Sequence, residues 1–160
     1  MRPIRTLATA ALLLALSAAP ARADATAFIG ANTTRSNRPV KGFAFGLGLL
    51  VIAFEFEYAD TGEDVAVPAP ALKTGMGNML LQPPFPVFGF QPYFTTGGGI
   101  YRESLGTDQQ TGVGTNVGGG VKVSVAGPLR LRVDYRVFKL GRGALHSPAH
   151  RVYAGINLSF

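Results

Sequence analysis

Apolar and charged side chains alternate strictly along residues 129–137, which read Leu-Arg-Leu-Arg-Val-Asp-Tyr-Arg-Val. Successive side chains of a β-strand point to opposite faces of the sheet, so this period of two predicts a strand with one apolar and one charged face. Four ionised groups on one face need water or charged partners. The segment is therefore expected to separate two different environments.

Seven further segments carry strand patterns that are separated by turn signals. Together with the first, the predicted strands are 25–34, 42–49, 52–58, 72–81, 90–103, 112–125, 129–139 and 150–160. The 21 glycines and 11 prolines oppose helices, and no later stretch resembles a membrane-spanning helix. The chain is therefore expected to be all-β, with an even number of strands.

The second and third predicted strands form a hairpin with matching faces. A tight turn at 50–51 places Leu49 opposite Ile52 and Phe45 opposite Phe56. Both apolar sets then fall on the same side of the sheet. The turn itself lacks the Gly or Asn that a two-residue hairpin loop normally uses.

A second hairpin is predicted around a three-residue turn at 126–128. This turn places Val125 opposite Leu129 and Val123 opposite Leu131. The compact connections are 50–51, 83–88 and 126–128, and the longer polar ones are 35–41, 59–71, 104–111 and 140–149. Short turns at one end and longer loops at the other are typical of membrane barrels.

The first 23 residues have the organisation of a cleavable signal peptide. Arg2 and Arg5 precede a short apolar stretch at 7–19, and a small-x-small cleavage motif follows at 21–23. The apolar stretch is too short to remain as a membrane anchor. We predict removal of these residues and a single domain of residues 24–160.

Composition narrows the possible chemistry. The sequence contains no cysteine, which excludes disulfides and thiolate metal sites. The formal net charge of +6 falls to +3 once the arginines of the signal peptide are removed, so no nucleic-acid partner is predicted. His146 and His150 have no carboxylate or cysteine nearby in the sequence, and no glycine cluster has dinucleotide-binding spacing. We predict no metal and no cofactor.

The charged faces of the strands require a charge balance if they line a narrow barrel. The inward candidates are Glu55, Glu57, Glu103, Lys122, Arg130, Arg132, Asp134, Arg136 and Arg151. Glycines on the same parity leave room for long side chains: Gly97, Gly99, Gly112, Gly114, Gly118, Gly120 and Gly155. Because side chains just fill an eight-stranded barrel, we predict a plugged lumen with an interior ion-pair network. A structural network is favoured over a catalytic pair formed by Glu55 and Glu57.

The pattern as a whole predicts an eight-stranded antiparallel up-and-down transmembrane β-barrel, apolar toward lipid and charged inside. An even number of strands brings both chain ends to the same side. The expected location is the bacterial outer membrane, with the N- and C-termini in the periplasm.

The chain end carries a family resemblance. Tyr153, Gly155, Leu158 and Phe160 resemble the terminal signal of bacterial outer-membrane barrels. Segments 91–99, 116–120 and 131–136 also resemble the OmpA/OmpX-like outer-membrane β-barrel domain family. The resemblance implies biogenesis through periplasmic chaperones and the β-barrel assembly machinery, and it supplies no catalytic residues. The chain departs from the family in having no Trp, so its interfacial girdle is expected to use Phe and Tyr.

Three functions are compatible with the pattern. The favoured one is a non-enzymatic barrel that stabilises the envelope or presents loops at the surface. A lipid A-modifying enzyme, a deacylase or acyltransferase, would need a Ser-His-acid set, for which Ser147, His146 and Glu103 are the candidates. Adjacent strand residues point to opposite faces, so His146 and Ser147 would meet only in an irregular loop.

The third possibility inverts the barrel into a soluble periplasmic lipid carrier. Phe54, Phe56, Leu131 and Val133 would then line a calyx and the charges would face water. Repeated glycines on the charged face argue against this arrangement, since a solvated surface has no use for them.

A basic outer rim is expected around the longer loops, and its members are Arg35, Arg38, Lys41, Lys139, Arg142, His146 and His150. Such a rim fits either loop solubility or contact with lipopolysaccharide phosphates. Outer-membrane lipid and lipopolysaccharide are accordingly the predicted partners.

Overall fold

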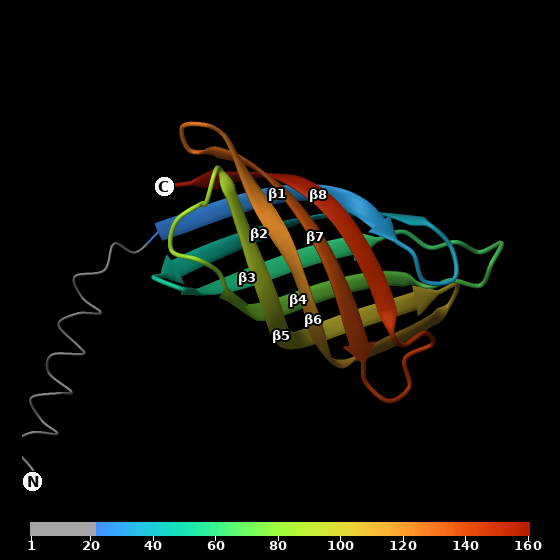
Figure 1. The fold of residues 1–160 in the computed structure, drawn as a ribbon. Helices are drawn as coiled ribbons and strands as arrows, with labels where there is room; N and C mark the ends of the chain where they lie inside the picture. Colours follow the sequence, from blue (N-terminus) through green and yellow to red (C-terminus); the bar gives the residue numbers. More distant parts are fainter. Residues whose placement is uncertain (1–21) are drawn as a thin grey trace, which may run out of the picture.

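The computed structural model describes residues 22–160, which form a closed barrel in which each strand pairs with its sequence neighbours (Figure 1). The strands are β1 (Arg22–Asn32), β2 (Arg38–Leu49), β3 (Ile52–Thr61), β4 (Ala71–Leu81), β5 (Phe90–Leu105), β6 (Asp108–Ala126), β7 (Leu129–Leu140) and β8 (Ala149–Ser159). The predicted eight-stranded antiparallel up-and-down barrel is confirmed. Between residues 22 and 160, no helix is long and apolar enough to cross a membrane.

The predicted signal peptide falls almost entirely on residues 1–21, which lie outside the described residues. Arg22 and Ala23, at the predicted cleavage site, belong to β1 in this chain and pair with Gly48 and Leu47 of β2. Cleavage at this site therefore stays a prediction.

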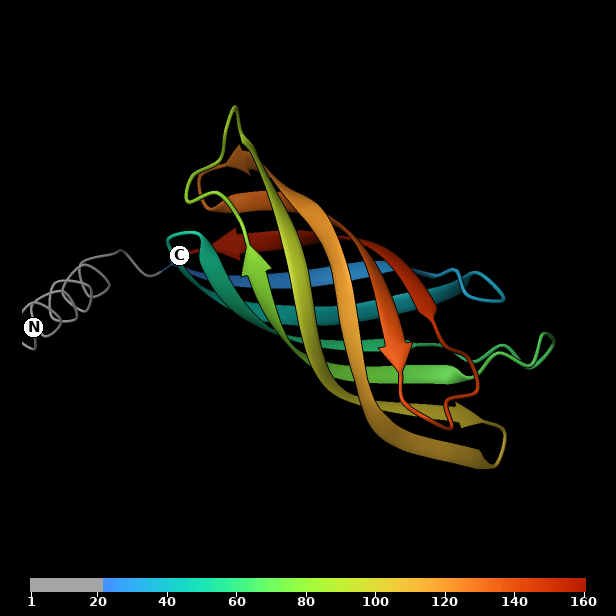
Figure 2. The same cartoon turned by 60° about the horizontal axis from the view of Figure 1, so that its bottom comes forward.

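The barrel closes where β1 pairs with β8, as the ribbon in Figure 2 shows. The backbone N–H of Phe160 donates to the carbonyl of Ala23 at 2.9 Å, and the N–H of Ala23 donates to the carbonyl of Phe160 at 2.8 Å. Closure removes the free sheet edges, whose unpaired backbone groups are too costly to expose to lipid.

The β2–β3 hairpin has the predicted register. Phe45 lies opposite Phe56, and Leu49 lies opposite Ile52 across the two-residue turn. Leu50 supplies the left-handed backbone conformation of that turn, with φ of 55°, where a Gly or Asn was expected. The apolar side chains therefore share the outer side, as the alternation predicts.

The predicted hairpin between β6 and β7 is right in pairing Val123 with Leu131, but its three-residue turn is wrong. Ala126, not Val125, lies opposite Leu129, and the register shifts between Ser124 and Ala126. A β-bulge at this point adds one residue to β6 and shortens the connection to Gly127 and Pro128. Gly127 adopts a φ of 52°, which Gly tolerates at no steric cost.

The predicted long connection at 104–111 is also wrong. Ser104 pairs with Gln109 and Leu105 with Asp108, so the turn contains only Gly106 and Thr107. The polar side chains of this segment predicted a loop, but its backbone hydrogen bonds continue the two strands. Gly106 provides the positive φ that the tight turn needs. The longer connections are 33–37, 62–70, 82–89 and 141–148.

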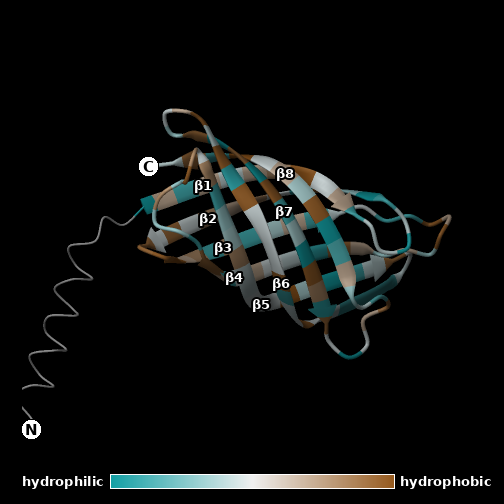
Figure 3. Ribbon diagram, viewed as in Figure 1, coloured by the Kyte–Doolittle hydropathy of each residue, from teal (hydrophilic) through white to brown (hydrophobic). Residues whose placement is uncertain are grey.

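The apolar side chains point outward and the charged ones inward. Phe56 and Leu131 are each 51% exposed, whereas Glu55 is 4% exposed. Figure 3 shows this as alternating hydrophobic and hydrophilic residues along the strands. A calyx lined by the apolar residues is therefore excluded, because that lipid-carrier hypothesis requires the opposite polarity.

Inward glycines make room for large neighbours in the lumen. A Cβ on Gly118 would lie 2.2 Å from the Tyr135 carbonyl oxygen and 2.8 Å from Arg136 Cγ. A Cβ on Gly120 would lie 2.5 Å from the Tyr93 hydroxyl. Because real Cβ atoms do not approach this closely, both positions require glycine as long as the lumen keeps these side chains.

We predict that Gly118→Ala destabilises the barrel by about 1–3 kcal/mol, the usual cost of overpacking. The reason is the backbone carbonyl of Tyr135, which cannot swing aside as a side-chain end can. The free energy of unfolding in detergent, from urea titration, is the measurement.

Gly98→Ala is the matched control, because Gly98 lies on the outward parity of β5. A Cβ there would lie 3.5 Å from the nearest atom, the Gly114 carbonyl oxygen, which is an ordinary contact. Equal destabilisation by the two substitutions would show that the lumen is not tightly packed around Gly118.

Candidate functional site

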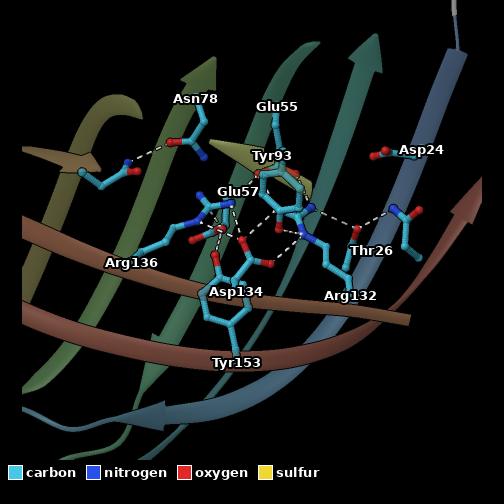
Figure 4. Close-up of polar contacts among 12 residues, drawn as sticks. Asp24, Thr26, Glu55, Glu57, Asn78, Tyr93, Arg132, Asp134, Arg136 and Tyr153 are labelled. Atoms are coloured by element: carbon cyan, nitrogen blue, oxygen red, sulfur yellow. Dashed lines mark hydrogen bonds and ion pairs between the residues drawn. The ribbon is translucent and has the colours of Figure 1, made fainter. Parts of the chain in front are cut away.

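The lumen is crossed by ion pairs between β3 and β7 (Figure 4). Arg132 of β7 donates from Nη1 to Glu55 Oε2, and Arg136 donates from Nη2 to Glu55 Oε1 at 2.8 Å. All three side chains are almost completely buried. One carboxylate of β3 thus holds two guanidinium groups from a strand that is not its neighbour.

Asp134 lies between the two arginines on the same face of β7. Its Oδ2 accepts a hydrogen bond from Arg132 Nε at 2.7 Å, and its Oδ1 is 3.3 Å from Arg136 Nη2. Residues two apart along a strand point to the same side, so the sequence places these three groups together before any tertiary contact forms.

Glu57 extends the network to β8. Its Oε2 is 2.9 Å from Arg136 Nη1 and accepts a hydrogen bond from the Tyr153 hydroxyl at 2.6 Å. Its Oε1 is 3.6 Å from Arg151 Nη1. The cluster contains three carboxylates and three guanidinium groups, so it is formally neutral, which is what burial of charge requires.

Aromatic rings line the same lumen, and the sequence analysis missed them. The Arg132 guanidinium lies 5.0 Å from the ring centre of Tyr93, and the Arg151 guanidinium lies 4.4 Å from that of Phe138. Phe28 stacks on Tyr153 with ring centres 4.4 Å apart. The signal was present in the sequence, because these rings stand on the same parity as the charged residues.

The structure brings six of the nine predicted interior residues into this one cluster: Glu55, Glu57, Arg132, Asp134, Arg136 and Arg151. A separate pair forms between Lys122 and Asp24 of β1, with Nζ 2.5 Å from Oδ2. The sequence analysis did not include Asp24, although its inward parity on β1 was available.

Two predicted interior residues lie away from the cluster. Arg130 is half-buried and donates from Nη1 to Gln91 Oε1 at 2.9 Å. Glu103 is buried near the opposite end, where its Oε2 accepts a hydrogen bond from the backbone N–H of Leu145 at 2.8 Å. Both face the interior, but neither contributes to the central network.

The candidate catalytic set is not assembled in residues 22–160. Both ring nitrogens of His146 lack a hydrogen-bond partner there, and Ser147 Oγ is occupied by the backbone of Leu140. Glu103 binds the backbone of the 141–148 loop instead of a histidine. The Glu55 and Glu57 carboxylates, the other conceivable acid–base pair, are both held by arginines. The described residues hold no cluster of three or more potential metal-ligating side chains.

Only some of the residues predicted for the basic outer rim are exposed at the loop end. Arg38 is wrong as a member, because its inward parity on β2 buries it and its Nη1 donates to the Pro70 carbonyl beneath the 62–70 loop. His150 is hydrogen-bonded through Nδ1 to the Tyr135 hydroxyl at 2.7 Å. The exposed members are Arg35, Lys41, Lys139 and Arg142.

The four residues of the expected assembly signal divide between the two faces of β8. Tyr153 is buried in the lumen and Gly155 shares its parity, whereas Leu158 and Phe160 are exposed on the outer wall. Their role in assembly stays a prediction.

No protein-family model matches the sequence, and no curated protein matches it. Several solved structures share the fold, including the following three. The chain aligns with the N-terminal β-barrel domain of Pseudomonas aeruginosa OprF at 15% identity over 87% of this chain and 97% of that one, with a TM-score of 0.67. Neisserial surface protein A (NspA) aligns at 18% identity over 88% and 96%, with a TM-score of 0.64. Ail, the attachment invasion locus protein of Yersinia pestis, aligns at 11% identity over 88% and 98%, with a TM-score of 0.56.

These neighbours are small outer-membrane barrels, and the chain has their fold. The architecture agrees with the OmpA/OmpX-like barrels that the strand and chain-end motifs resemble. Identities this low define the fold and leave the role of the protein open.

We predict that Arg132→Leu lowers the free energy of unfolding by about 3–5 kcal/mol, because it leaves Glu55 and Asp134 short of a buried counter-charge. The double variant Glu55→Leu/Arg132→Leu restores neutrality and should cost less than the sum of the two single substitutions. Urea unfolding in detergent measures all three.

Lys139→Leu is the control, because Lys139 is an exposed residue of the same strand that forms no ion pair within residues 22–160. Its effect should stay within about 0.5 kcal/mol. Strict additivity of the Glu55 and Arg132 substitutions would contradict their coupling.

Proposed function

We propose that the protein is an integral outer-membrane β-barrel with a plugged, charged lumen and a non-enzymatic role in the envelope, as a structural element or as a carrier of surface loops. The observation that carries this proposal is an apolar outer wall enclosing a neutral, buried ion-pair network. In water the wall would be a large exposed apolar surface, whereas in a bilayer it contacts acyl chains.

The proposed orientation places both chain ends in the periplasm. β1 begins and β8 ends at the same end of the barrel (Figure 1), together with the connections at 50–51, 82–89 and 127–128. The connections at 33–37, 62–70, 106–107 and 141–148 lie at the other end. Two of the three connections at the first end have two residues, whereas three of the four at the other end have five or more. This difference supports the orientation, because periplasmic turns are short and extracellular loops longer in such barrels.

The proposed partners follow from that location. Outer-membrane lipid, including lipopolysaccharide, contacts the outer wall, and the β-barrel assembly machinery and periplasmic chaperones handle the chain during biogenesis. The exposed Leu158 and Phe160 on the outer wall support recognition of the chain end. The other two members of the candidate catalytic set are bonded to backbone groups, Ser147 Oγ to Leu140 and Glu103 Oε2 to Leu145, which supports a non-enzymatic role over lipid A modification.

The sequence contains no Trp, so a single introduced Trp is a unique fluorescent probe. We predict that Phe56→Trp, in the protein reconstituted into bilayers with brominated acyl chains, is strongly quenched by the bromine and inaccessible to aqueous iodide. The reason is the outward position of Phe56 in the middle of β3.

Val65→Trp provides the control, because Val65 is 75% exposed in the 62–70 loop. Its fluorescence should respond to iodide and not to brominated lipid. Iodide quenching of the Trp at position 56 would exclude a membrane-embedded wall and refute the proposed function.

We also predict that the protein shows no large, steady conductance in planar bilayers, because the Glu55–Arg132 and Glu57–Arg136 pairs cross the lumen. The neutral double variant Glu55→Ser/Arg132→Ser removes one crossing and should increase the frequency of conducting events. Steady single-channel steps from the unmodified protein would contradict the plugged lumen.

A further inference from the structure

The outer wall contains an apolar groove of about 780 Å³. Its floor consists of two small side chains, Ala27 of β1 and Ala154 of β8, and its sides include Phe43, Leu131 and Ile156. Register explains the shape, because Ala27 lies between Phe43 and Ile156 on the neighbouring strands. A hollow between large side chains on a lipid-facing wall is filled by an acyl chain, since a void forfeits dispersion contacts.

The end of the groove nearest the longer loops is charged. Lys41 of β2 and Asp60 of β3 line it and are direct cross-strand partners. The row continues through Lys73 of β4, which pairs with Asp60, to Arg102 of β5, which pairs with Lys73. The four residues therefore form one continuous line across the outside of the barrel.

These charges, like Lys139 of β7, interrupt an outer face that is mostly apolar. A Lys or Arg on the lipid side costs about 2–4 kcal/mol at the bilayer midplane and nearly nothing at the interface. Lys73 and Asp60 stay partly exposed although their charged atoms are only 3.9 Å apart. The row lies near the loop end of the wall, where its net positive charge attracts headgroup phosphates.

The length of the row selects the headgroup. Neighbouring strands are about 4.8 Å apart, so Lys41 and Arg102, separated by three strand spacings, lie about 14 Å apart along the wall. One phosphate cannot contact both. A headgroup with two separated phosphates can, and Asp60 between the cations can accept hydrogen bonds from sugar hydroxyls.

We propose that the groove and the row together form a binding site for one bisphosphorylated glycolipid of the lipid A type. One acyl chain occupies the groove over Ala27 and Ala154, one phosphate contacts Lys41, and the second contacts Lys73 and Arg102. This site rests on the proposed function, because it requires the wall to face a membrane.

The test uses the protein purified from outer membranes and exchanged into lipid-free detergent. Native mass spectrometry measures binding of bisphosphorylated lipid A, of lipid A lacking one phosphate, and of phosphatidylglycerol. We expect one saturable bisphosphorylated lipid A per barrel. Each exposed cation contributes about 1 kcal/mol to binding of anionic lipid, so Lys41→Gln and Arg102→Gln should each weaken binding about fivefold.

Two variants test the groove without changing any charge. Ala27→Phe and Ala154→Phe fill the floor from two different strands, and each should weaken binding at least fivefold while leaving the urea midpoint unchanged. Ala25→Phe is the matched control on the same outer face of β1, outside the groove lining. Lys139→Gln is the matched control for charge, because Lys139 lies outside the row.

The outcomes separate the two proposals. Equal binding of phosphatidylglycerol or of lipid A with one phosphate would overturn the two-phosphate site, as would groove or row variants that match their controls. In either case, quenching of the Trp at position 56 by brominated lipid would still stand as support for the membrane barrel. If brominated lipid failed to quench that Trp, the proposed membrane barrel itself would be refuted, and with it the lipid site that depends on it.

Discussion

Charge neutrality inside the lumen is the constraint on which the rest of the structure depends. A guanidinium or carboxylate removed from water costs several kcal/mol unless it is paired, so Glu55, Arg132 and Arg136 are tolerated only together. A slip of one residue in any strand turns every side chain to the other face. The network therefore fixes the registers of β3 and β7, which share no backbone ladder.

Backbone pairing and side-chain pairing satisfy different requirements of the same barrel. Closure between β1 and β8 satisfies the backbone groups that lipid cannot. The ion pairs and aromatic rings then fill the closed interior, and glycines such as Gly118 and Gly120 let them approach the wall. The lumen of so narrow a barrel accommodates these large side chains only because some inward positions of the wall are glycines without side chains.

The sequence was sufficient to predict the strands and the face on which each side chain lies, because both follow from a period of two. It could not identify the partners. Parity shows that Glu55 and Arg132 point inward, but their contact across the lumen depends on barrel tilt and stagger, which no local pattern encodes. For the same reason the stacking of Phe28 on Tyr153 was missed. The bulge at Val125 was missed because a single extra residue leaves the alternation on either side intact.

Charged residues at outward positions, which depart from the alternation, are also informative. Lys41, a charged outward residue, marks the end of the apolar wall of β2 on the side of the longer loops. From Lys41 to Leu49 the strand advances eight residues, which is about 26 Å. At a tilt of about 40° this is about 20 Å along the membrane normal, less than the apolar band of about 25 Å in such barrels. Leu50 and Val51, which are both exposed, extend the apolar band beyond Leu49. An apolar turn without Gly or Asn is thus the expected solution where the turn itself lies at the membrane boundary.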